Sequence, residues 1–447
     1  MTKTKSLCFR TLAIQVLLLA CVLSGVAAQP RHRKNKDNLP RGKLRDSIVR
    51  LPERQQAKAF EKLNSIAYRD EDADNIRADL EGDIFVVDPG QNETADSIAL
   101  RPRAQALPMN TQVSYTASGI PLLHSKPGSA NVIFLDFDGH VITGTAWNNG
   151  GQATYNALPF DLDGTPSSFN AAEQAAITGV WGRVAEDYAP FDVDVTTEQP
   201  AAFTARTGRV LITKNYDASN LAMPSTNAGG VAYVNVFSTQ FYVSYYSPAL
   251  VYYNNLGNGR EDYVAEACSH EMGHNLGLSH DGTSTVSYYS GGGSGATSWS
   301  PIMGGSYNRY VSKWNNGDYP GANNKEDDVA IIASRFSLKP DDVGNTQATA
   351  SPLTVTGTSI SGKGVIGATS DVDVWSFTTG AGTVTINVDP FIAATNTRGG
   401  NLDIKIALYA SGDSNTAVSS ADNNADTKAT LTTTLAAGTY YLSVMPS

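Results

Sequence analysis

The sequence is poor in cysteine. Its 447 residues include three cysteines, and two of them, Cys8 and Cys21, lie within residues 1–28. The third, Cys268, has no internal disulfide partner, so core burial or a bound metal must stabilise the fold. The neighbours of Cys268 indicate a small side chain buried on a helix rather than a nucleophile.

Basic residues are scarce outside the N-terminal region. Residues 1–69 contain 15 Lys and Arg against 4 Asp and Glu, which leaves 18 against 39 for residues 70–447, a net charge of −21. A protein that binds nucleic acid needs a basic surface on its folded part. The distribution therefore argues against nucleic acid as a partner.

The only long apolar run has the pattern of a secretory signal peptide. Basic residues precede the run, residues 11–26, and small residues end it at Ala28. We expect a signal peptide over residues 1–28 and a secreted, extracellular protein with no stable membrane insertion after cleavage. A membrane anchor and a lipoprotein anchored through Cys21 are the less favoured alternatives, since the run is short and apolar residues follow that cysteine.

Composition divides the rest of the chain into three parts. Residues 29–127 are polar and interrupted by prolines, with one helical pattern over residues 51–67, and are predicted to be a partly disordered pro-segment. Residues 128–338 mix helical and strand patterns and predict an α+β domain. Residues 339–447 are rich in Thr, Ser and Gly, with short strand patterns that predict a small all-β sandwich.

The α+β part shows its elements in the apolar periodicity. Helices are predicted over residues 169–188, 263–276 and 326–336, and strands over residues 132–135, 191–196, 209–213 and 230–237.

Three of the six histidines fall in the string His270-Glu271-Met272-Gly273-His274-Asn275-Leu276-Gly277-Leu278-Ser279-His280. On a helix, residues four apart share a face, so the first two imidazoles can reach one ion. Gly277 can adopt a positive φ, end the helix and bring His280 to the same ion.

Three imidazoles suit Zn²⁺ and leave a fourth position for water, which is typical of a catalytic site. Glu271, next to the first ligand, is placed to take a proton from that water and deliver it to a leaving amine. The alternatives are a helix with coincidental histidines or a zinc site kept for stability, in which Glu271 would have no role.

The string resembles the zinc motif of the metzincin metalloendopeptidases, and Asp281 after the third histidine makes it similar to the adamalysin, or reprolysin, branch. Met303, in Ser-Pro-Ile-Met-Gly, resembles the family's methionine turn. The resemblance implies a twisted mixed sheet with an active-site helix, one catalytic Zn²⁺, Met303 as an apolar floor below the imidazoles, and Asp281 and Gly277 as structural support.

The sequence also departs from that family. It lacks the disulfides of animal adamalysins, which indicates a bacterial member, and it has Gly305 where astacin-like and serralysin-like relatives carry a tyrosine. The pro-segment contains no cysteine, so latency of the predicted zymogen requires another zinc ligand or simple steric cover.

Two further features are less specific. The segment Gly229-Gly230-Val231-Ala232-Tyr233-Val234 resembles the metzincin edge strand that pairs with an extended substrate, although it can also be an ordinary edge strand. The acidic turns 136–140 and 161–164 are candidate Ca²⁺ sites, but neither is a complete calcium loop, and turn-forming carboxylates explain them better. His140 is better explained as a turn residue than as a ligand of a second metal.

The last hundred residues resemble the bacterial pre-peptidase C-terminal domain through residues 371–377, 401–403 and 437–442. Relatives continue beyond the last strand seen here, so the module is expected to be incomplete at its C-terminus. The sequence as a whole predicts a secreted, monomeric zinc endopeptidase acting on protein or peptide substrates. The alternative is a catalytically inactive zinc-binding protein or an adhesin.

Overall fold

The computed structural model describes residues 33–92, 113–392 and 398–447. The predicted signal peptide lies outside the described residues. Residues Lys34–Ser447 form one unit. The described ranges contain no helix with the length and apolar character needed to cross a membrane.

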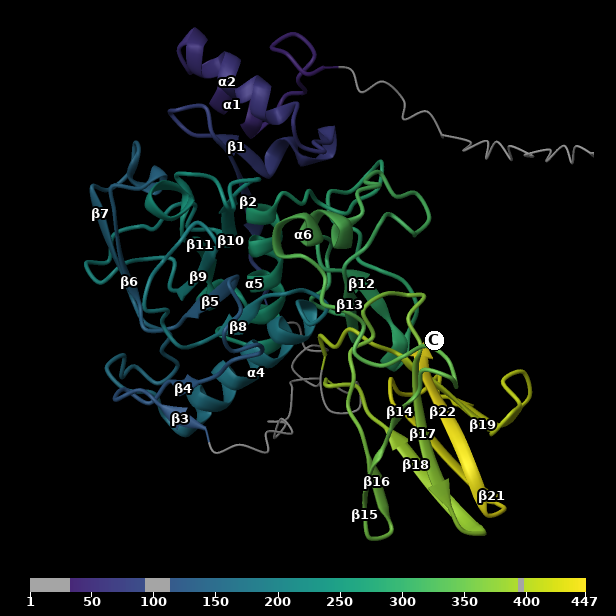
Figure 1. Cartoon of the computed structure of the whole chain (residues 1–447). Coiled ribbons are helices and arrows are strands. Elements are labelled where there is room, and N and C mark those ends of the chain that lie inside the picture. Colours follow the sequence, from purple (N-terminus) through teal and green to yellow (C-terminus); the bar gives the residue numbers. More distant parts are fainter. Residues whose placement is uncertain (1–32, 93–112, 393–397) are drawn as a thin grey trace, which may run out of the picture. The chain divides into compact units, whose positions relative to one another are not determined.

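Seven strands form a central mixed sheet: β1 (Ile76–Ala78), β2 (Ile84–Pro89), β5 (Val132–Asp136), β8 (Asp194–Thr196), β9 (Thr207–Thr213), β10 (Ala228–Tyr233) and β11 (Ala249–Tyr252). Their order is β1-β2-β10-β11-β9-β5-β8 (Figure 1). The pairs from β11 to β8 are parallel, whereas β1, β2, β10 and β11 pair antiparallel.

Three helices accompany the sheet: α4 (Ala171–Asp187), α5 (Glu261–Leu276) and α6 (Asp328–Phe336). They match the three helical patterns of the sequence. Asn170 begins α4 because its side chain accepts hydrogen bonds from the amides of Ala172 and Glu173, while the Glu173 carboxylate accepts one from the Asn170 amide.

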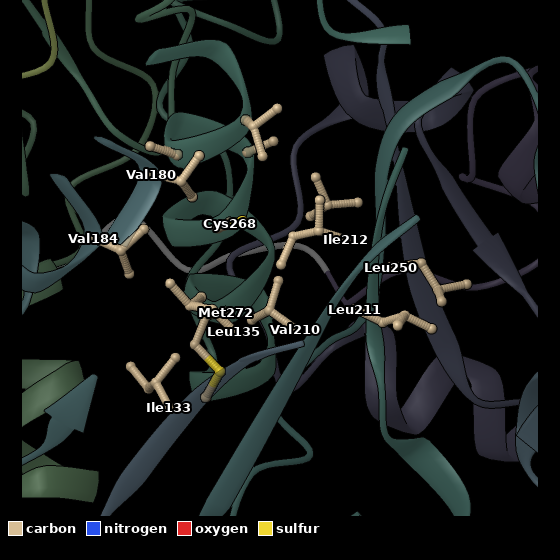
Figure 2. Close-up of a cluster of buried hydrophobic side chains, with 14 of the residues drawn as sticks. Ile133, Leu135, Val180, Val184, Val210, Leu211, Ile212, Leu250, Cys268 and Met272 are labelled. Carbon is tan, nitrogen blue, oxygen red and sulfur yellow. The ribbon is translucent and has the colours of Figure 1, made fainter. Parts of the chain in front are cut away.

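The main hydrophobic core lies between the sheet and the helices. Figure 2 shows Ile133 and Leu135 of β5 with Val210 of β9, close to side chains of α4 and α5. Cys268 of α5 is fully buried in this core, as expected for a small apolar residue. Burial raises the pKa of its thiol well above the ordinary value, so the thiolate is disfavoured.

The N-terminal segment, residues 34–92, is folded. It contains α1 (Lys43–Val49), α2 (Glu53–Leu63) and the 3₁₀ turn η1 (Asp70–Asp74), followed by β1 and β2. Leu44, Ile48, Ala59 and Leu63 are buried in a hydrophobic cluster of this segment. The helical pattern predicted α2, but neither β1 nor β2 was predicted.

Shorter elements complete this region: β3 (Ser114–Tyr115), β4 (Pro121–Leu122), β6 (His140–Thr143), η2 (Ala146–Asn148), β7 (Thr154–Ala157), η3 (Tyr242–Tyr246), η4 (Tyr253–Asn255), η5 (Gly295–Thr297), β12 (Trp299–Pro301) and β13 (Val311–Lys313). The sequence patterns did not predict β11 or the β6–β7 hairpin. They also extended β10 four residues too far, because Asn235 has a φ of 56° and ends the strand.

The C-terminal part is a β-rich domain. Its strands are β14 (Ser351–Pro352), β15 (Thr354–Thr356), β16 (Ser359–Ser361), β17 (Asp373–Thr379), β18 (Gly382–Val388), β19 (Ile404–Ala410), β20 (Ala417–Asp422), β21 (Ala429–Leu435) and β22 (Gly438–Pro446). The sheet β14-β17-β22-β19-β20 and the pair β18-β21 bury one hydrophobic cluster. The last strand, β22, is central in its sheet, between β17 and β19. The predicted fold class, an α+β domain followed by an all-β domain, is confirmed.

Candidate metal centre

Helix α5 carries the first two histidines of the motif. The ring centroids of His270 and His274 are 4.8 Å apart, as expected for residues one helical turn apart on the same face. Both residues are buried, with 6% and 1% of their surfaces exposed. The helix therefore presents two imidazoles at one point inside the protein.

The third histidine reaches that point because α5 ends at Gly277. This residue has a φ of 117°, and the amides of Gly277 and Leu278 both donate to the Gly273 carbonyl. Such a left-handed C-cap suits glycine, which has no Cβ to clash. The chain then turns, and the His280 ring lies 5.4 Å from that of His270 and 4.9 Å from that of His274.

Hydrogen bonds from Nδ1 fix the orientation of the first two rings. Nδ1 of His270 lies 2.7 Å from the Ile302 carbonyl oxygen, and Nδ1 of His274 lies 2.9 Å from that of Leu278. A carbonyl oxygen only accepts, so each Nδ1 carries the proton and Nε2 keeps its lone pair for a metal.

A carboxylate from the N-terminal segment faces all three rings. Oδ1 of Asp88, on β2, lies 2.9 Å from Nε2 of His280. Oδ2 of Asp88 lies 3.6 Å from Nε2 of His270 and 3.4 Å from Nε2 of His274. The four side chains are buried, and their ligand atoms all lie within 4.8 Å of one another.

This donor set fits zinc. The buried Nε2 atoms of His270 and His274 and the buried Oδ2 of Asp88 have no hydrogen-bond partner in the described structure. Burying a polar atom without a partner costs free energy of folding, and a cation bound between these three atoms would give each of them a partner. Three imidazole nitrogens and one carboxylate oxygen are ligands that Zn²⁺ prefers.

The surrounding charges also favour a cation. Burial lowers the pKa of His274 to about 4, which keeps its ring neutral. Burial opposes protonation of His280 too, but the carboxylates of Asp72 and Asp88 outweigh it and raise that pKa to about 10. The two carboxylates therefore create a negative potential at the third ring.

Asp72 is a second contribution of the N-terminal segment. Its Oδ1 lies 2.9 Å from Nδ1 of His280, the ring nitrogen that faces away from Asp88. This contact orients the third ring as the carbonyl groups orient the other two.

Glu271 lies next to the metal position. It is 1% exposed, and neither of its carboxylate oxygens has a hydrogen-bond partner among the described residues. Burial, and then the charge of Asp88, raise its pKa well above the ordinary value. A Cβ built on Gly230 of β10 would lie only 1.9 Å from Oε1 of Glu271. The glycine thus makes room for the carboxylate.

The methionine turn lies against α5. Met303 is fully buried, and a Cβ built on Gly273 would lie 2.7 Å from its sulfur atom. The Asp281 amide donates to the Met303 carbonyl at 2.8 Å, which connects the loop of the third histidine to the turn. Burial, and then the charge of Glu326, raise the pKa of the Asp281 carboxyl to about 7.

The segment expected to hold substrate pairs with the N-terminal segment. Gly230 is in register with Asp88, Val231 with Val87 and Ala232 with Val86, in an antiparallel arrangement that continues to Tyr233. On its other side, β10 pairs with β11. Without β1 and β2, β10 would be the edge of the sheet.

Tyr288 also contacts the centre. Its hydroxyl donates to Oδ1 of Asp88 at 2.5 Å, and its ring centroid is 4.5 Å from that of His280. Two residues after Met303, where some relatives carry a tyrosine, this chain has Gly305. A tyrosine reaches the centre from the loop before the turn instead.

Sequence patterns did not identify four residues of this centre: Asp72, Asp88, Gly273 and Tyr288. Gly273 lies inside the motif, where its small size was a usable signal. The other three reach the histidines only through tertiary packing, and the sequence pattern gave no signal for them.

The candidate calcium turn 161–164 uses its carboxylates locally. Oδ1 of Asp161 accepts from the amides of Gly164 and Thr165 at 2.6 and 2.9 Å, and the Asp163 side chain also accepts from Thr165. Asp136 is buried, with Oδ2 at 3.5 Å from Nε of Arg209. His140 begins β6 and does not join the histidine cluster. The contacts of Asp161 and Asp163 are those of turn-forming carboxylates, but ligand atoms of Asp161, Asp163 and Glu173 also lie within 4.8 Å of one another, so calcium binding stays a prediction.

Two family models match the chain. The metallopeptidase family M12B reprolysin-like model matches residues 161–325, from the turn before α4 to beyond Met303. The bacterial pre-peptidase C-terminal domain model matches residues 371–445, which contain β17 to β22. None of the curated proteins with which the chain was compared matches it. The chain therefore combines a region similar to the reprolysin-like metallopeptidases of family M12B with a region similar to bacterial pre-peptidase C-terminal domains.

Proposed function

We propose that the protein is a secreted, zinc-dependent endopeptidase of the metzincin type, which hydrolyses peptide bonds of proteins with Glu271 as general base. One observation carries the proposal. Three Nε2 atoms converge on one point, and the unpartnered carboxylate of Glu271 follows the first of these histidines on the same helix. A zinc site kept only for stability would give no reason to bury that carboxylate.

His270, His274 and His280 would hold the ion. Bound zinc would lower the pKa of a water molecule and polarise the carbonyl of the scissile bond. Glu271 accepts the proton of the attacking water and then donates it to the leaving amine. Its exclusion from bulk solvent favours this transfer, because no other group in the described structure competes for its oxygens.

Strand β10 positions the substrate. Backbone groups of residues 230–233 would pair with an extended peptide and hold its scissile bond above the ion, which is recognition by strand addition. The absence of a side chain at Gly230 lets the peptide approach Glu271 closely.

Export of the protein is supported by its N-terminal pattern of a basic start, an apolar run and small residues. A reprolysin-like peptidase joined to a pre-peptidase C-terminal domain is also typical of extracellular bacterial proteases.

The test combines metal analysis with hydrolysis of casein or a fluorogenic peptide by the secreted protein. We expect about one zinc per chain, loss of hydrolysis in a chelator and recovery with added Zn²⁺. Glu271→Ala should keep the metal and lose roughly 10²- to 10⁴-fold in rate, the usual share of a general base. Undiminished turnover by Glu271→Ala would refute the base, and a metal-loaded protein that cleaves nothing would favour the binding-protein alternative.

A further inference from the structure

The N-terminal segment occupies the place proposed for substrate. Strand β2 pairs with β10 over residues 85–89 and runs antiparallel to it, the direction expected of a substrate peptide. Asp88 is the residue in register with Gly230, beside Glu271. The strand therefore brings a carboxylate, rather than a scissile peptide bond, to the histidines.

Two of the three distances from Asp88 to the histidine rings are those of atoms that share an ion. Two ligand atoms, each about 2.0–2.1 Å from a tetrahedral zinc, are about 3.3 Å apart. Oδ2 of Asp88 lies 3.4 Å from Nε2 of His274 and 3.6 Å from Nε2 of His270, and it has no hydrogen-bond partner in the described structure. These separations are too long for good hydrogen bonds. The other oxygen, Oδ1, accepts a hydrogen bond from the Tyr288 hydroxyl at 2.5 Å and lies 2.9 Å from Nε2 of His280.

We propose that Asp88 is the fourth ligand of the metal in the uncleaved chain, where it takes the position of the catalytic water. Together with β2, which covers β10, it keeps the peptidase inactive until the N-terminal segment leaves. This inference rests on the proposed function and specifies its regulation.

Other contacts of the segment support this role. Asp72 orients His280 from the far side of its ring, and Asp79 accepts a hydrogen bond from the Tyr233 hydroxyl of β10 at 3.0 Å. The segment thus contacts the metal site at two carboxylates and the substrate strand along its length. It contains no cysteine, and Cys268 is buried in the core, so a carboxylate is the strong zinc ligand that this segment brings to the site.

The first experiment tests coordination without relying on activity. Full-length protein carrying Glu271→Ala, which prevents self-cleavage, is loaded with Co²⁺ and compared with the same protein carrying Asp88→Asn or Asp88→Ala. Glu81→Gln is the matched control, because Glu81 is an exposed acid in the turn before β2. The readouts are the visible absorption of Co²⁺, its shift on adding acetohydroxamate, and the rate of metal release to a chelator.

We expect the Co²⁺ absorption of both Asp88 variants to differ from that of the parent and to shift when acetohydroxamate is added. Both variants should also release the metal at least about ten-fold faster than the parent. In the parent and in Glu81→Gln, acetohydroxamate should not shift the Co²⁺ absorption, and metal release should not be faster. Asp88→Asn keeps the size of the side chain, and circular dichroism confirms that the variants are folded. Folded Asp88 variants with the parental spectrum and release rate would overturn the proposal.

The second experiment tests latency in chains that retain Glu271. We expect uncleaved Asp88→Asn, with its length checked by mass spectrometry, to hydrolyse a fluorogenic peptide at least about ten-fold faster than uncleaved wild type. An uncleaved variant as inactive as wild type would overturn the role of Asp88 in latency. If chains freed of residues 34–92, and shown by circular dichroism to be folded, also cleave nothing, the proposed function fails, whereas the cobalt measurements still decide whether Asp88 binds the metal.

Discussion

At the scale of single residues, the proposed role of Glu271 depends on the space around its carboxylate. The carboxylate is buried against Gly230, and a Cβ at that position would overlap Oε1 at 1.9 Å and Cδ at 2.4 Å. Rigid side-chain positions within about 0.5 Å are needed for a catalytic group to act efficiently.

Gly230→Ala should therefore displace Glu271 and lower kcat/KM by about 10²-fold or more, while zinc content stays unchanged. Steady-state hydrolysis and metal analysis check this. Gly305→Ala is the control, since a Cβ at that position would lie 3.7 Å from its nearest neighbouring atom. Equal activity in the two variants would show that Glu271 does not need this space.

Two other glycines of the motif also matter through their lack of a side chain. Gly273 allows Met303 to lie against α5, and Gly277 ends that helix. The motif thus depends as much on missing side chains as on its histidines.

At the scale of elements, the end of α5 is expected to connect fold stability to metal binding. Gly277 has a φ of 117°, and a Cβ there would lie 3.1 Å from Oδ1 of Asn235. A residue other than glycine in the left-handed region costs about 1–2 kcal/mol. Any relaxation of that strain moves the loop that carries His280.

We predict that Gly277→Ala lowers both Tm and zinc affinity. Calorimetry and competition with a metal-binding dye measure the two effects. Gly412→Ala is the control, because Gly412 has a φ of 84° and open space around it in the C-terminal domain. Gly412→Ala should introduce a similar backbone strain but leave the zinc affinity unchanged. A Gly277→Ala protein with wild-type zinc affinity would contradict the link between this turn and His280.

The position of β2 is a second feature at this scale. A strand from residues 84–89 completes a sheet whose other strands, apart from β1, all come from residues 132–252. The N-terminal segment is thus integrated into the same sheet as the strand proposed to hold substrate.

At the scale of the whole molecule, the metal is expected to contribute to folding. A ligand that binds only the folded state stabilises it by about 4 kcal/mol when its free concentration is about 1,000 times Kd. Without the ion, buried donor atoms of His270, His274 and Asp88 lack partners in the described structure.

Stripping zinc from the full-length protein should therefore lower Tm by several degrees, and Zn²⁺ but not Ca²⁺ should restore it. Differential scanning calorimetry with and without a chelator measures the change. Glu271→Ala should show the same shift as wild type, because this residue is not a ligand. A Tm that is independent of zinc would contradict a metal held by four buried side chains.

The sequence by itself determined the local features of this protein. His270 and His274 share a face because the helix repeats every 3.6 residues, and Gly277 permits the turn that brings in His280. The apolar periods of α4, α5 and the C-terminal strands β17, β18, β19, β21 and β22 likewise predicted those elements, since side-chain direction follows from local geometry, whereas β14, β15, β16 and β20 were not predicted.

Only the tertiary structure decided what surrounds the histidines. Asp88 lies 192 positions from His280 along the chain and Asp72 lies 208 positions away. The register of β2 on β10 brings Asp88 to Gly230, and a shift of one residue would turn its carboxylate to the other face of the sheet. Such a register depends on packing between distant segments, which the periodicity of one sequence does not contain.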